Sequence, residues 1–198
     1  MGEPLHRIWS VAEFFAWVEL QPDRYELVDG QPLKMMSGAK NVHDDIAVNL
    51  IVLLGNRLRG RGCRPFTGDG SLETRPGQIR RPDVGVDCGP RDPNATMAAL
   101  PKLVIEAPSP NECDFDSFRK REEYKGVASV DYILLVEPNE PIVAFWSRDP
   151  TRQWTERRVR GLEETIEISE LAIALNLGAI YEAVEFPVVP RLVGRAPE

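Results

Sequence analysis

The sequence lacks the motifs that mark several common classes of enzyme. It contains no G-x-S-x-G, no G-x-G-x-x-G and no P-loop, so neither the serine of an α/β-hydrolase nor a nucleotide cofactor is indicated. Histidine is scarce, and neither His6 nor His43 has an evident serine or cysteine partner along the chain. Nucleophilic hydrolysis is therefore set aside.

Cysteines and long apolar runs are also scarce. Cys63, Cys88 and Cys113 are odd in number and form no C-x-x-C pair, a pattern that predicts free thiols in a reducing compartment. No apolar run approaches the roughly 20 residues that a membrane span needs, and the first residues lack the apolar stretch of a signal peptide. We therefore expect a cytoplasmic protein without a membrane partner.

Positive charge is too sparse for a strongly basic nucleic-acid binder, because the net charge is −7. An acidic enzyme can still act on nucleic acid when a local basic patch or a bound cation offsets the global field. The candidate patch consists of the arginines of two neighbouring segments: Arg57, Arg59, Arg61, Arg64, Arg75, Arg80 and Arg81. The alternative, which the pattern alone favours, is a solvated helix end with arginines near its C-terminal dipole.

Signals for helices and turns are well marked in the first third of the chain. Ser10 and Glu13 have the spacing of a capping box, which predicts a helix start. Asp29-Gly30 is the turn signal of a β-hairpin. The longest helical pattern covers residues 41–62, where apolar residues recur on one face.

The order of predicted elements indicates the fold class. The chain has 198 residues, of which 42% are hydrophobic and 28% charged, values typical of a soluble globular protein. Strand-like runs follow the long helix, then a polar helix, then further strands. We expect an α+β fold with one mixed β-sheet flanked by helices. The domain should cover residues 1–186, and a Pro-rich tail residues 187–198.

Two of the strand-like runs carry a carboxylate where an aliphatic residue is usual: Asp83 and Glu106. A buried, unpaired carboxylate is costly. Side chains alternate along a strand, so Asp83 shares a face with Gly85, and Glu106 with Val104. If the strands are neighbours, the two acids converge, and a hard cation such as Mg²⁺ or Mn²⁺ would relieve their repulsion. Gly85 would leave space for a metal, water or phosphate.

The polar helix after these strands carries a stripe of three residues, Asp116, Lys120 and Tyr124, each four residues apart. A strand-to-helix turn could bring Lys120 back over the carboxylate pair, where its charge would stabilise a phosphoryl transition state or position water. The spacing alone favours the other interpretation, an ordinary surface ion pair between Asp116 and Lys120.

Six segments, in the same order and at nearly the same spacings, resemble the Uma2 (DUF820) family of the PD-(D/E)xK restriction-endonuclease-like superfamily. They are RYELVDGQ, NVHDDIAVNLIVLL, RRPDVGV, LVIEAPSP, DFDSFRKREEY and GVASVDYILLVEP. The resemblance runs through most of the chain and implies a restriction-endonuclease-like fold.

The resemblance implies roles for particular residues. Asp83 and Glu106 would be the metal-binding acids of a site that uses Mg²⁺ or Mn²⁺. Glu26 is similar to the additional N-terminal acid of the superfamily; the alternative is a partly exposed strand carboxylate. His43 matches the family's histidine, although a lone histidine near a helix start is more often structural or solvated.

The lysine departs from the superfamily pattern. The (D/E)xK motif would place it two residues after the second acid, where this chain has Pro108. In Uma2 proteins the lysine comes from the following helix, which makes Lys120 the candidate. Lys125 is the fallback, followed by Lys102 and Lys34.

The resemblance favours a metal-dependent endonuclease that hydrolyses DNA phosphodiester bonds with low sequence specificity. Asp83, Glu106, Lys120 and Glu26 would be catalytic. Accessory residues would come from His43, Tyr124, Asp116 and Arg81. The alternative is a catalytically inactive binding or assembly module on the same fold.

Self-association is a further expectation, because nucleases that cut duplex DNA often act as dimers. Phe145, Trp146 and Trp154 lie on or near C-terminal strands that could form an edge or patch of a homodimer. The pattern itself favours the alternative, in which these aromatic residues pack in the core.

Overall fold

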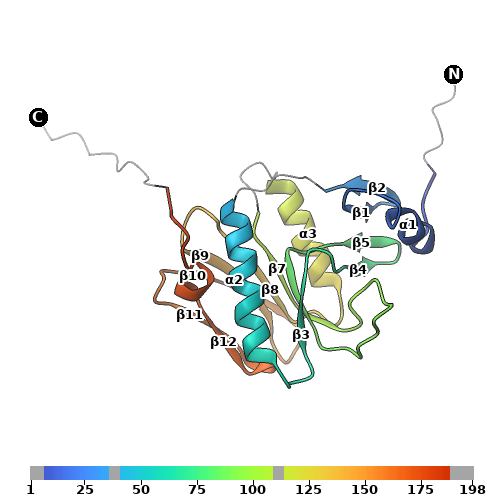
Figure 1. The fold of residues 1–198 in the computed structure, drawn as a ribbon. Coiled ribbons are helices and arrows are strands. Elements are labelled where there is room, and N and C mark those ends of the chain that lie inside the picture. The colour runs from blue at the N-terminus through green and yellow to red at the C-terminus, as the bar shows by residue number, and fades with distance from the viewer. Residues whose placement is uncertain (1–6, 36–40, 109–113, 188–198) are drawn as a thin grey trace, which may run out of the picture.

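The structure is a computed structural model that describes residues 7–35, 41–108 and 114–187. The predicted tail therefore lies almost entirely outside the described residues, as does the side chain of Asp116. Three β-sheets, of four, six and two strands, and the helices packed on them form the described part of the chain (Figure 1). None of its helices has the length and apolar content of a membrane span.

A four-stranded antiparallel sheet forms the N-terminal side of the molecule, in the order β2-β1-β5-β4. Its strands are β1 (Tyr25–Val28), β2 (Gln31–Lys34), β4 (Leu72–Arg75) and β5 (Gln78–Arg80). The predicted hairpin turn is confirmed, because Asp29 and Gly30 have φ angles of 50° and 73°, as a type I′ turn requires. Helix α1 (Val11–Val18) begins at the predicted capping box of Ser10 and Glu13.

A six-stranded sheet carries the main core, in the order β10-β9-β8-β7-β6-β3. Its strands are β3 (Arg64–Thr67), β6 (Val84–Asp87), β7 (Pro101–Glu106), β8 (Tyr132–Val136), β9 (Ile142–Arg148) and β10 (Trp154–Arg160). Strands β7 and β8 are parallel and the other neighbours antiparallel. The predicted mixed sheet flanked by helices is thus confirmed.

Helices α2 (Asn41–Leu58) and α3 (Asp114–Gly126) cover opposite faces of this sheet (Figure 1). Alternation along β7 explains the two layers, since successive side chains point to opposite faces. Leu103 and Ile105 pack in the cluster that contains the buried face of α2, whereas Val104 packs with Tyr124 of α3.

The C-terminal part completes the α2 face. A hairpin and two short helices follow β10: β11 (Thr165–Ile168), η1 (Ser169–Leu171), β12 (Ile173–Asn176) and α4 (Leu177–Ile180). Strand β12 and helix α4 contact α2, and their apolar side chains join the same core cluster.

Residues 79–87 are divided between the four-stranded and the six-stranded sheet. Strand β5 belongs to the small sheet and β6 to the large one, so Arg81, Pro82 and Asp83 form the connection. Asp83 therefore lies at the junction of the sheets, immediately before its own strand begins.

The prediction of free thiols was wrong for Cys63 and Cys88, which form a disulfide with an S–S distance of 1.99 Å. Arg64 pairs with Asp87 across strands β3 and β6, so the residues just beyond this pair face each other. Their 25-residue separation gave no sign of the pairing, which depends on the sheet register. Cys113 lies outside the described residues.

The expected aromatic patch of a homodimer is not formed by Phe145 and Trp146, which are 6% and 3% exposed. Phe145 stacks on Tyr132 in the α2-side core, and Trp146 packs on the α3 side. Trp154 is half-buried beside Trp146. The alternative interpretation, core packing, is the one observed.

Candidate active site

The carboxylates of Asp83 and Glu106 meet where β7 ends. Strands β6 and β7 pair Val84 with Ile105, and this register continues to place Asp83 opposite Glu106. The backbone N–H of Ala107 donates to Asp83 Oδ2 at 2.8 Å. The negative charge of Asp83 also contributes to raising the pKa of Glu106. Two acids from different sheet segments therefore share one local environment.

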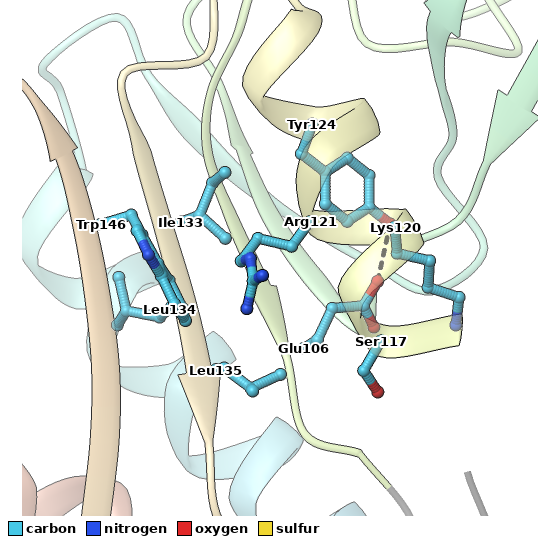
Figure 2. Close-up of a pocket in the computed structure, with 9 residues that line it drawn as sticks. All are labelled: Glu106, Ser117, Lys120, Arg121, Tyr124, Ile133, Leu134, Leu135 and Trp146. Carbon is cyan, nitrogen blue, oxygen red and sulfur yellow. Dashed lines mark hydrogen bonds between the residues drawn. The ribbon is translucent and has the colours of Figure 1, made fainter. Parts of the chain in front are cut away.

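Glu106 is held by a buried tyrosine. The Tyr124 hydroxyl donates to Glu106 Oε1 at 2.6 Å (Figure 2). Burial raises the pKa of Glu106, and the charge of Asp83 adds to this effect, whereas Lys120 opposes it. Burial and the nearby Glu106 charge also raise the pKa of Tyr124, so the phenol remains a donor.

Asp83 is held by a histidine from the other face of the sheet. His43, in the first turn of α2, places Nε2 3.0 Å from Asp83 Oδ1. Burial would raise the pKa of Asp83, but the hydrogen bond and charge of His43, the Ala107 amide and Lys120 hold it below its ordinary value. The lowered pKa favours the ionised form of Asp83. Each carboxylate oxygen of Asp83 can accept more than one partner, because it carries two lone pairs.

Lys120 is the lysine whose charge reaches both acids, lowering the pKa of Asp83 and opposing the rise at Glu106. Figure 2 shows its side chain running beside Glu106 from α3. The other three candidates have partners elsewhere: Lys34 pairs with Asp23, Lys102 with Asp131, and Lys125 with Glu122. The helix that follows β7 therefore brings the charge of Lys120 close to both acids.

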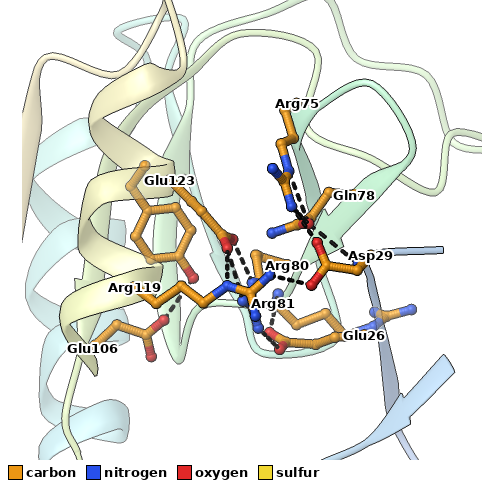
Figure 3. Close-up of polar contacts among 10 residues, drawn as sticks. Glu26, Asp29, Arg75, Gln78, Arg80, Arg81, Glu106, Arg119 and Glu123 are labelled. Carbon is orange, nitrogen blue, oxygen red and sulfur yellow. Dashed lines mark hydrogen bonds and ion pairs between the residues drawn. The ribbon is translucent and has the colours of Figure 1, made fainter. Parts of the chain in front are cut away.

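Glu26 lies near the pair but is bound to arginines. Arg80 Nη1 donates to Glu26 Oε2 at 2.7 Å, and the Arg81 backbone N–H donates to Oε1 at 2.9 Å (Figure 3). Its charge contributes to raising the pKa of Glu106, which places it close by. Both oxygens are engaged, so in this arrangement Glu26 supports the site rather than presenting a free ligand. Arg81 itself donates to the carbonyl oxygens of Tyr25 and Asp69.

The predicted arginine patch does not form one surface. Arg80 is fully buried between carboxylates, and Arg64 pairs with Asp87. Arg57 follows His43 by 14 residues along α2, a rise of about 21 Å. The helix arginines therefore lie at the end of α2 remote from Asp83. The seven arginines are close together in the sequence, but they belong to different elements, which place them apart in the fold.

Gly85 does not leave space for a ligand, contrary to expectation. A Cβ at this position would come within 2.1 Å of the Phe66 ring. Phe66 is the cross-strand partner of Gly85 in β3, so their side chains point to the same face. The missing side chain of Gly85 accommodates an aromatic ring.

The structure adds Arg121 to the site. It lines a small pocket with Glu106, Lys120 and Tyr124, and Trp146 forms part of the wall (Figure 2). The pocket volume is about 10 Å³, on the order of one water molecule. The Arg121 guanidinium carbon lies 4.8 Å from the Phe118 ring centroid and 4.9 Å from that of Trp146. The spacing of Phe118 and Arg121 was visible in the sequence, but Trp146 comes from β9.

Two carboxylates match the requirements of a hydrated magnesium ion, which commonly uses one or two protein carboxylates and keeps several waters. Within the described ranges, no group of three or more His, Cys, Asp or Glu side chains is arranged to hold a metal. Oε2 of Glu106 and the remaining lone pairs of Asp83 are the donors that fit. A cation between them would remove the like-charge repulsion seen at Glu106.

Comparison with known proteins identifies the fold and then the family. The crystal structure of a protein from Anabaena variabilis ATCC 29413, described as "a putative nuclease belonging to DUF820", matches with a TM-score of 0.67. Identity is 16%, and the match covers 89% of this chain and 99% of that one. At this identity the likeness shows the nuclease-like DUF820 fold alone.

The chain belongs to the Uma2 family, described as "Putative restriction endonuclease", whose profile matches residues 11–178. The resemblance inferred from the six segments is thereby confirmed. The uncharacterized protein slr1290 of Synechocystis sp. is 28% identical over 179 residues, which are 89% of this chain and 93% of that protein.

Proposed function

We propose that this protein is a metal-dependent endonuclease that hydrolyses DNA phosphodiester bonds. The description of the Uma2 family and the nuclease-like fold support the general class. The observation that carries the proposal is the placement of Asp83 opposite Glu106, with the charge of Lys120 acting on both. A buried acid with a purely structural role is paired with a positive charge or with hydrogen-bond donors. Here a second acid also lies opposite the first, and the two negative charges repel each other.

Asp83 and Glu106 would hold the Mg²⁺ or Mn²⁺ ion. When bound, such an ion polarises the scissile phosphate and lowers the pKa of coordinated water. Tyr124 holds one oxygen of Glu106, and the second oxygen, Oε2, would bind the ion. His43 orients Asp83. These contacts pre-arrange the two acids, so less reorganisation is needed when a substrate arrives.

Lys120 and Arg121 would act on the substrate's charge. The Lys120 ammonium offsets negative charge that develops on the phosphoryl oxygens and helps to orient the attacking water. Arg121 lies on the same helix at the pocket edge, held between aromatic rings. A guanidinium there can contact a neighbouring phosphate, giving affinity independent of base sequence. The remote arginines of α2 would contact DNA only away from the cleavage position.

The second candidate function is an inactive binding or assembly module. Two observations favour it: Asp83 is already paired with His43, and the pocket beside Glu106 is small. On this reading the acids and their partners stabilise the junction between the sheets. Self-association remains a prediction for either function.

A plasmid-nicking assay separates the candidates. Wild-type protein and the isosteric variants D83N and E106Q would be incubated with supercoiled DNA in millimolar Mg²⁺ or Mn²⁺, and with EDTA. D69N serves as control, since Asp69 is a largely exposed acid on the loop before β4. We expect metal-dependent nicking by wild type and D69N alone. Equal nicking by all four proteins would identify a contaminant, and none by the wild type would favour the module.

A further inference from the structure

Arg80 is a charged side chain that is completely buried between three elements of the fold. From β5, its Nε and Nη2 donate to the two carboxylate oxygens of Glu123 on α3, at 2.7 and 3.0 Å. Its Nη1 donates to Glu26 on β1 at 2.7 Å (Figure 3). Arg80 is 0% exposed. A forked pair of this kind fixes both distance and direction, because two parallel hydrogen bonds define a plane.

This cluster connects the two segments that supply the proposed site. Arg80 precedes Asp83 by three residues, at the strand that leads into the junction. Glu123 lies between Lys120 and Tyr124 in the sequence of α3. The Arg80–Glu123 pair therefore joins the chain that presents one acid to the helix that presents the lysine and the tyrosine.

A second arginine extends the connection to the N-terminal hairpin. Arg119 donates to Glu123 at 3.0 Å and to Asp29 at 2.6 Å. Asp29 sits in the turn between β1 and β2, where Arg75 also contacts it. Charges of opposite sign thus alternate from the hairpin turn to the middle of α3 (Figure 3).

Apolar packing alone specifies the position of α3 weakly. Over residues 117–126, Tyr124 is the one side chain that is fully buried, and the remainder are exposed or half-buried. A single buried ring fixes the distance of a helix from a sheet but leaves rotation and sliding poorly determined. Directional bonds to a buried arginine supply the missing constraint.

We infer that Arg80 is a positioning residue, which holds α3 in the register that places Lys120 and Tyr124 over Asp83 and Glu106. This inference rests on the proposed function, and it gives the Glu26–Arg80–Glu123 cluster a role that ordinary buried ion pairs lack. Glu26, which resembles an additional acid of the superfamily, acts here as the second anchor of Arg80.

The test compares R80K and E123Q with D131N. R80K keeps the charge but loses the fork, and E123Q keeps the shape but loses the charge. Asp131 is also buried, at 5% exposure, and pairs with Lys102 and Arg152. Its partner Lys102 lies near the start of β7, four residues before Glu106. This separation corresponds to about 13 Å along the strand. D131N therefore measures the loss of a buried ion pair at the other end of the sheet.

Three quantities would be measured for each protein: kcat for plasmid nicking at saturating Mn²⁺, the Kd for Mn²⁺, and hydrogen exchange of the α3 amides. For R80K and E123Q we expect kcat to fall about tenfold or more, because the lysine is misplaced. The Kd should stay within about threefold, and α3 should exchange about tenfold faster relative to β8. D131N should keep kcat and α3 exchange within about twofold at similar loss of stability.

A double variant tests whether Arg80 acts through the lysine. If it does, R80K should lower kcat much less in the K120A background than in the wild type. The inference is overturned if R80K and E123Q keep wild-type kcat, or if D131N lowers kcat and α3 protection equally. Failure of the proposed function gives a different result, because the wild type would then show no metal-dependent nicking. In that case the rate of hydrogen exchange of the α3 amides in R80K and E123Q would decide whether Arg80 holds the helix.

Discussion

Asp83 and Asp87 lie at the two ends of β6, and the structure gives them different surroundings. Asp87 is 3% exposed and accepts hydrogen bonds from the Gly89 and Leu100 amides and from Arg64. Asp83, before the other end, is more exposed and faces His43 and a second acid. Asp87 is fully compensated by donors. Asp83 shares its surroundings with a like charge, which is unfavourable unless a cation or proton is present. The feature that distinguishes Asp83 from Asp87 is therefore the second acid, Glu106, in its surroundings.

The largest expected effect is that of replacing Asp83, and it tests this comparison directly. D83N should lower the metal-dependent nicking rate by about 10³-fold, since a metal ligand and its charge are lost. D87N should retain the nicking rate within about threefold and lower the free energy of unfolding by about 2 kcal/mol, because hydrogen bonds to a charged group are weakened. Nicking kinetics and urea unfolding would be measured on both variants. Equal loss of activity would remove the distinction between the two ends.

The disulfide sharpens the same contrast, because it lies at the Asp87 end of β6. Replacing Cys63 with serine should lower the free energy of unfolding by about 2–4 kcal/mol, since the cross-link restricts the unfolded chain. Nicking by the folded variant should be unchanged within about twofold, as Cys63 lies remote from the acid pair. Urea titration under non-reducing conditions measures the first quantity. Peptide mapping without reduction would establish the linkage, and finding both thiols free would contradict it.

A smaller effect is expected from the lysine of α3. K120M should reduce kcat for nicking by about 30- to 100-fold while leaving the KM for DNA within about threefold, because its charge acts mainly on the transition state. K102M is the matched control, since Lys102 pairs with Asp131 at the opposite end of β7. A fall in kcat shared by both variants would show a general effect of lost positive charge.

The smallest expected effect concerns substrate affinity. R121A should weaken DNA binding by about three- to tenfold and reduce the slope of log affinity against log salt by about 0.9, the value for one phosphate contact. R59A is the control for a remote charge, since Arg59 is exposed in the turn that follows α2. Fluorescence anisotropy at several salt concentrations gives both quantities. An unchanged slope for R121A would exclude the phosphate contact.

The sequence by itself determined the elements with strong local signals. The capping box of α1, the Asp29-Gly30 turn and the long amphipathic α2 all follow from local dihedral and periodicity rules. The six ordered motifs also indicated the family. Alternation grouped Asp83 with Gly85 and Glu106 with Val104, and the convergence of the two acids was expected only if their strands were neighbours.

Tertiary structure alone decided which side chains became partners. The Cys63–Cys88 bond, the Phe66 ring over Gly85, and the burial of Arg80 between Glu26 and Glu123 all join residues far apart in the chain. Local sequence constrains φ and ψ over a few residues. Sheet register and helix placement, by contrast, emerge from the packing of the whole core, so the charge balance around each acid could be read only after the chain had folded.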